Sequence, residues 1–207
     1  SQRPRHCAMI RTDEAQSACF DSGLLYVGDW GTGKLTVIDV SNPYKPELRS
    51  KSDLGGYGDG VAVSGDHCCV ATGLNRKGNN DSTSSLHGDG HGLEVFRLST
   101  SGSPEHLARV EFPLLEVKSN DFWSIRIAGK TAFVADTHNG VFQVDLSNPE
   151  QPVCVGRLEL PAGSRFDSRA DGRVIISVPD CAGGVAIGDG VLYVVGEKTG
   201  LHIAKIA

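Results

Sequence analysis

The sequence of 207 residues lacks several features that mark broad classes of protein. It contains no apolar run that approaches the roughly 20 residues of a membrane-spanning helix. Methionine occurs once, and long helical patterns are missing. It has no run or stripe of lysine and arginine, and its formal net charge is −5. Neither a nucleic acid nor an anionic membrane is therefore an expected partner.

Common catalytic and metal-binding motifs are also missing. The six cysteines include no Cys-x-x-Cys pair, which disfavours a thiolate zinc cluster. Most cysteines lie within strand patterns, and we expect either buried free thiols or at least one disulfide. The neighbours Cys68 and Cys69 should point to opposite faces of a sheet and not pair with each other. No Gly-x-Ser-x-Gly nucleophile elbow occurs, so the sequence favours a noncatalytic function.

What the sequence does contain is glycine and an internal repeat. Glycine occurs 26 times, as expected where tight turns join many strands. The stretch Gly33–Pro43 returns as Gly140–Pro149, and weaker copies stand at Gly92–Ser99 and Gly200–Ile206. A repeat of short strands with a period of roughly 40–60 residues predicts a radial or solenoidal β architecture.

We therefore predict an all-β fold, a β-propeller of about four four-stranded blades that forms a single domain over residues 1–207. The last repeat ends before its fourth strand, and Pro4–Arg11 resembles Pro152–Arg157. An N-terminal strand that completes the last sheet would close the ring and remove two exposed edges. A fragment of a larger propeller is the alternative. The expected blades cover approximately 15–54, 60–114, 121–160, and 181–207 together with 3–11.

An aspartate recurs at one position of the repeat, directly before the Ser-Asn-Pro turn. It is Asp39 in the first copy and Asp145 in the third, whereas Arg97 and Lys205 replace it in the other two. An Asp side chain can hydrogen-bond the backbone of the turn that follows it. Recurrence within a repeat favours this architectural role.

The repeated segments of this sequence resemble the LVIVD-repeat family of β-propellers. The resemblance rests on two groups of segments, which are Leu25–Asp29, Leu35–Pro43 and Pro46–Leu48, and then Phe133–Asp136, Gly140–Pro149 and Pro152–Val155. The family is mostly bacterial and archaeal and often exported or surface-associated. The resemblance implies a binding or scaffolding role and an extracellular, periplasmic or cell-surface location. Residues Ser1–His6 do not have the pattern of a signal peptide.

The candidate ligand-binding residues gather on one expected face of the propeller. Connections between second and third strands, and connections from blade to blade, should both emerge there. A concave surface with aromatic and polar groups is the default binding site. Trp30 and Trp123 have an alternative role, which is packing between adjacent sheets. The candidates are Asp29, Trp30, Tyr57, Asp59, Asp121, Trp123, Asp136 and His138.

A candidate metal site lies at His87, Asp89 and His91, with His138 as a further member. Imidazole and carboxylate groups suit zinc or another first-row metal. The Gly-Asp-Gly stretches could instead bind calcium. The alternatives are a flexible solvated loop and ordinary turns, and our main expectation is that the protein has no cofactor.

The leading functional hypothesis is a noncatalytic propeller that presents its loop-rich face to a protein or carbohydrate partner. One alternative is a metal-assisted hydrolase or lyase that uses the candidate metal site at the rim. Another is a structural component of a larger assembly.

Overall fold

The computed structural model describes residues 3–76, 90–99, 103–113, 124–167 and 174–206. Within these ranges the chain consists of strands and their connections and contains no helix, which confirms the all-β prediction. No helix in this part of the chain is long and apolar enough to cross a membrane.

The strands form successive antiparallel sheets, which we number as blades 1 to 4 in chain order. Blade 1 contains β1 (Ala15–Asp21), β2 (Leu24–Asp29), β3 (Lys34–Asp39) and β4 (Glu47–Asp53). Blade 2 contains β5 (Gly56–Ser64), β6 (His67–Arg76), β7 (Gly92–Arg97) and β8 (Glu105–Glu111). Blade 3 contains β9 (Ser124–Ala128), β10 (Thr131–Asp136), β11 (Gly140–Asp145) and β12 (Val153–Leu158).

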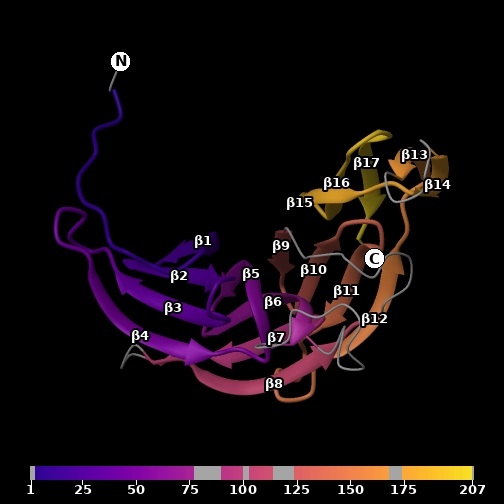
Figure 1. The fold of residues 1–207 in the computed structure, drawn as a ribbon. Coiled ribbons are helices and arrows are strands. Elements are labelled where there is room, and N and C mark those ends of the chain that lie inside the picture. Colours follow the sequence, from indigo (N-terminus) through magenta and orange to yellow (C-terminus); the bar gives the residue numbers. More distant parts are fainter. Residues whose placement is uncertain (1–2, 77–89, 100–102, 114–123, 168–173, 207) are drawn as a thin grey trace.

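In the described part of the chain, blade 4 has three strands, which are β15 (Ala182–Gly188), β16 (Val191–Gly196) and β17 (Gly200–Lys205). A separate hairpin of β13 (Ala162–Asp167) and β14 (Val174–Pro179) precedes it. The first strands of the blades contact one another in the order β1, β5, β9 and β15. The blades thus follow one another along an arc (Figure 1), as in a propeller.

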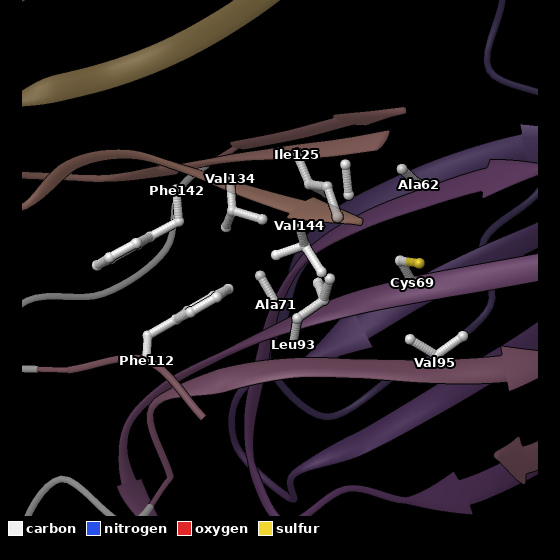
Figure 2. Packing of buried hydrophobic residues seen from close by; sticks show 11 residues of the cluster. Ala62, Cys69, Ala71, Leu93, Val95, Phe112, Ile125, Val134, Phe142 and Val144 are labelled. Atoms are coloured by element: carbon white, nitrogen blue, oxygen red, sulfur yellow. The ribbon is translucent and has the colours of Figure 1, made fainter. Parts of the chain in front are cut away.

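Each blade packs against the next through apolar side chains that alternate along its strands. On β6, Cys68 belongs to the cluster between blades 1 and 2, and Cys69 to the cluster between blades 2 and 3. This confirms that the two neighbours point to opposite faces. Figure 2 shows the second cluster, in which the rings of Phe112 and Phe142 stack with centroids 4.5 Å apart. A third cluster joins blades 3 and 4.

The recurring aspartates hold the turn that follows the third strand. Oδ1 of Asp39 accepts the N–H of Ser41 at 2.9 Å, and Oδ1 of Asp145 accepts the N–H of Ser147 at 2.8 Å. Hydrogen bonds from the Ser41 hydroxyl and from Arg49 hold the pKa of the Asp39 carboxyl well below its usual range. These contacts bear out the architectural role expected from the repeat.

The predicted ring closure is not present in the structure. Residues 3–11 form no strand, and Figure 1 shows this segment running away from β17. The segment is instead attached to blade 1. The N–H groups of Asp13 and Glu14 donate to the Asp29 carboxylate, and the N–H of Trp30 donates to the carbonyl of Glu14. These bonds fix the direction in which the preceding chain leaves blade 1.

All six cysteines are free, and three of them, Cys68, Cys69 and Cys181, are the buried free thiols that the first of the two alternatives predicts. Burial raises the pKa of Cys69 to about 12 and that of Cys181 to about 11. It also raises the pKa of Cys68 well above its usual value. These buried thiols behave as small apolar side chains rather than as nucleophiles.

We expect Cys69→Ser to lower the free energy of unfolding by about 1–3 kcal/mol, because it places a hydroxyl in an apolar cluster. Cys7 is exposed, so Cys7→Ser should leave the stability of the monomer unchanged. Urea denaturation of the two variants measures the difference. Equal effects of the two substitutions would contradict the packing described for β6.

We expect Asp39→Asn to lower the melting temperature at pH 7. The folded chain lowers the pKa of Asp39, so the carboxylate stabilises the fold above the unfolded pKa of about 3.9. That contribution is lost as the pH falls toward the folded pKa, so the difference from wild type should shrink below about pH 4. The control is Asp189→Asn, at an exposed turn position with φ 50° that Asn tolerates. An Asp39→Asn difference that is the same at pH 3 and pH 7 would refute this.

Candidate functional site

An aromatic pair joins the first two blades on the predicted ligand-binding face. Trp30 lies in the connection between β2 and β3, and Tyr57 lies at the start of β5. Their ring centroids are 5.4 Å apart, and the ring planes are tilted by 30°. Tyr57 is buried, whereas Trp30 is half-buried. Trp30 therefore packs between blades and still presents part of its ring to solvent.

Glycines beside Tyr57 allow β5 to approach its neighbours closely. A Cβ atom at Gly58 would lie 2.7 Å from Cδ1 of Leu54 and 3.0 Å from the backbone nitrogen of Asp29. A Cβ atom at Gly56 would lie 2.6 Å from the carbonyl oxygen of Gly90. A larger residue at Gly58 would push β5 away from blade 1, and one at Gly56 would push it away from the chain that enters β7. The Gly-Tyr-Gly sequence therefore positions the Tyr57 ring beside Trp30.

The candidate carboxylate of Asp29 is used within the chain. It is fully buried, and it accepts the backbone N–H groups of Asp13, Glu14 and Thr32 at 3.1 to 3.2 Å. The side chain closes the turn that carries Trp30 and attaches the N-terminal segment to blade 1. Its role in the described structure is to hold this loop.

Asp59 lies on β5 in an irregular part of the strand. The register between β5 and β6 shifts on both sides of Gly58, so Asp59 lies in a bulge. Its side chain is buried, and a Cβ atom on Gly28 of blade 1 would lie 2.3 Å from its carbonyl oxygen. Asp59 thus lies in the packed contact between blades 1 and 2.

Asp136 forms the centre of a buried polar cluster between blades 2 and 3. Its Oδ2 lies 3.1 Å from Nε2 of His91 and accepts Nδ2 of Asn139 at 2.7 Å. Nδ1 of His91 lies 3.2 Å from the carbonyl oxygen of Phe112. Both ring nitrogens therefore lie within hydrogen-bond distance of oxygen atoms of the chain. Within the described residues, Oδ1 of Asp136 has no hydrogen-bond partner.

His138 ties the loop of blade 3 to the chain that enters blade 4. It is half-buried, and its Nδ1 lies 2.7 Å from the carbonyl oxygen of Pro179. The N–H of Ala182 donates to the carbonyl of Thr137 at 2.7 Å. The Nδ1–H tautomer of His138 fits this contact, because a carbonyl oxygen can only accept.

Of the predicted metal site, the structure describes His91 and His138. His91 directs its ring toward Asp136 and Phe112. His87, Asp89, Asp121 and Trp123 lie outside the described residues. In the part of the chain that the structure describes, no group of three or more His, Cys, Asp and Glu side chains is arranged to hold a metal ion.

Two buried acidic residues, Asp180 and Glu94, were not predicted from the sequence. Asp180 accepts the backbone N–H groups of Cys181, Lys198 and Thr199, as Asp29 does for its own turn in blade 1. The signal for Asp180 was weak, because it precedes the last repeat and lies outside the motif.

The second missed residue is Glu94 on β7. It is buried, with its Oε1 2.9 Å from the Arg109 guanidinium and its Oε2 2.9 Å from Nε2 of His106. It also accepts the N–H of Gly55 of the chain between blades 1 and 2 at 2.6 Å. The signal was a charge within the apolar stretch Leu93–Phe96.

The comparisons with known proteins concern the repeat and the fold. The LVIVD repeat matches residues 20–53, 55–76 and 120–159. These segments include most of blades 1 and 3 and the first part of blade 2. No curated protein matches the chain.

Among solved structures, the computationally designed Ika4 protein is similar over 100% of both chains, with a TM-score of 0.60 and 8% identity. The designed Ika8 protein has a TM-score of 0.38 and 9% identity over 93% of this chain and 71% of its own. The N-terminal domain of Nup159 has a TM-score of 0.27 and 11% identity over 92% of this chain and 75% of its own. Ika4 is a designed propeller, and at this identity its likeness concerns the fold alone. The chain thus contains three segments that match the LVIVD repeat, and its all-β fold is propeller-like.

Proposed function

We propose that the protein is a noncatalytic binding propeller whose partner contacts the aromatic pair of Trp30 and Tyr57. The observation that carries the proposal is the half-buried Trp30 ring, held in place by a buried tyrosine of the next blade. Tryptophan and tyrosine supply large, rigid contact areas and often dominate the energy of binding. A ring that is already held in place loses little conformational freedom when a partner binds.

The hydrogen bonds that the candidate carboxylates make within the chain support this choice of surface. Asp29 uses its carboxylate to hold a turn, and Asp136 uses Oδ2 to hold His91 and Asn139. Both side chains are fully buried. Among the described candidates, the Trp30 ring therefore offers the clearest contact surface for a partner.

The proposed partner is a protein or a carbohydrate, since both are recognised by flat aromatic faces. The formal net charge of −5 argues against a polyanion. An extracellular, periplasmic or cell-surface location is part of the proposal, and it rests on the resemblance to a family that is often exported.

We expect Trp30→Ala to weaken partner binding at least about tenfold, because truncating a binding hot spot costs more than about 1 kcal/mol. Wild type and variant are compared on a glycan array and by interferometry against panels of secreted proteins. Tyr44→Ala is the matched control, because Tyr44 is 74% exposed in the connection between β3 and β4. The array and the protein panel separate the two partner classes. Unchanged binding by Trp30→Ala, or measurable substrate turnover by wild type, would contradict the proposal.

His91 supports a structural role for its cluster rather than the hydrolase or lyase alternative. Its ring is fully buried and lies edge-on to the rings of Phe112 and Phe142, with centroids 6.1 and 6.4 Å away. Both of its nitrogens face oxygen atoms of the chain.

We expect His91→Ala to lower the free energy of unfolding by about 1–3 kcal/mol, because it removes one of the hydrogen-bond partners of the buried Asp136 carboxylate. His6→Ala in the exposed N-terminal segment is the control and should have no effect. Thermal melts of wild type and both variants, each with and without a chelator, provide the measurement. A chelator that destabilises wild type as much as His91→Ala does would restore the metal-site hypothesis.

A further inference from the structure

The outer edge of blade 4 differs from those of the other blades. In blades 1 to 3 a fourth strand, which is β4, β8 or β12, pairs with the third strand. In blade 4, among the residues that the structure describes, the third strand, β17, pairs only with β16. The other edge of β17 therefore presents backbone N–H and C=O groups that can pair with a further strand.

A groove of about 290 Å³ lies beside this edge, between blades 3 and 4, and its lining is mainly apolar with polar side chains from Gln143, Arg157 and Lys205. At the preceding interface, Cys154 of the fourth strand β12 packs against the cluster between blades 2 and 3. A fourth strand in blade 4 would place its side chains in the groove in the same way. The apolar lining includes Phe133, Val141, Leu158, Leu192, Ala204 and Ile206.

The opposite face of blade 4 is also apolar. Val195 on β16 and Leu201 and Ile203 on β17 are 56%, 61% and 67% exposed. Side chains of a paired strand alternate between the two faces of its sheet. The strand that fits this edge therefore needs apolar side chains on both faces.

One described segment of the chain has this composition and lies outside every strand. Cys7–Ile10 reads Cys-Ala-Met-Ile, and residues 3–11 form no strand. Met9 is 75% exposed, and Cys7 is exposed as well. The surrounding Pro4–Arg11 resembles the start of β12, the fourth strand of blade 3.

The segment does not reach β17 of its own chain. Its attachment through Asp13 and Glu14 is fixed to blade 1, and the segment extends away from blade 4 (Figure 1). A segment held in this way is placed to reach a second molecule.

We propose that residues 4–11 of a second copy of this chain dock on the free edge of β17 as the fourth strand of blade 4. Cys7 and Met9 lie on one face of the added strand, and Ala8 and Ile10 lie on the other. One face fills the groove toward blade 3, and the other covers Leu201 and Ile203. The result is a strand-exchanged dimer.

The test is the oligomeric state of the full chain, measured by light scattering during size-exclusion chromatography over a range of concentrations. We expect a dimer whose dissociation constant rises at least tenfold in two double variants, Met9→Lys with Ile10→Lys, and Leu201→Lys with Ile203→Lys. Leu201 and Ile203 are both exposed in the described structure, so the variant that replaces them should fold normally. In the other variant Met9 is exposed and Ile10 is partly buried. Leu48→Lys and Val153→Lys are matched controls on β4 and β12, where the side chains are 52% and 55% exposed. A wild type that is monomeric at every concentration, or a dimer that both double variants leave intact, overturns the proposal.

A crosslink identifies which copy supplies the strand. A short bis-maleimide applied to the Ile203→Cys variant should join the native Cys7 of one chain to the introduced thiol of another and give a covalent dimer. The same reaction on a Cys7→Ser background should give no such product. A crosslink between Cys7 and the introduced thiol within a single chain would show that the segment docks on its own β17, which overturns the proposal that a second copy supplies the strand.

Discussion

The packing of one sheet face against the next is the constraint on which the rest of the structure depends. Strand side chains alternate between two faces, and both faces of these blades carry apolar residues. A single blade therefore cannot bury its own surface, and blades 2 and 3 each lie between two neighbours. Blades 1 and 4 end the arc, and exposed apolar side chains collect there, as Phe20 and Ile203 show.

Polar groups enter this apolar framework where the connections must be fixed. Asp29 and Asp180 accept backbone N–H groups at the entrances to blades 1 and 4. Between blades 2 and 3, Asp136 holds His91, and within blade 2, Glu94 holds Arg109. Since a buried carboxylate is costly without partners, these contacts specify how the blades and loops meet. These contacts also occupy carboxylates that a ligand could otherwise bind. Among the described residues of the predicted ligand-binding face, the Trp30 ring is therefore the clearest surface feature.

The features that follow from the repeat were predicted well from the sequence, because the same strand and turn pattern occurs several times along the chain. The alternation of Cys68 and Cys69 and the turn bonds of Asp39 and Asp145 follow from local periodicity and turn chemistry. Interactions between blades were harder to predict. The pairing of His91 with Asp136 joins residues 45 positions apart, and Glu94 carries no recurring motif. The N–H groups of Asp13 and Glu14 attach residues 3–11 to the Asp29 carboxylate of blade 1, and no strand pattern in the sequence predicts these hydrogen bonds.

Hydrogen exchange tests most directly whether neighbouring blades stabilise one another. Mass spectrometry would follow the backbone amides of β10 and β11 in blade 3 and of β16 and β17 in blade 4, at concentrations where the chain is monomeric. A strand sandwiched between two blades opens only with its neighbours, whereas an end blade can open alone. We expect β10 and β11 to exchange slowest and β17 to exchange fastest of these strands. Equal protection of β11 and β17 would contradict the dependence of each blade on both of its neighbours.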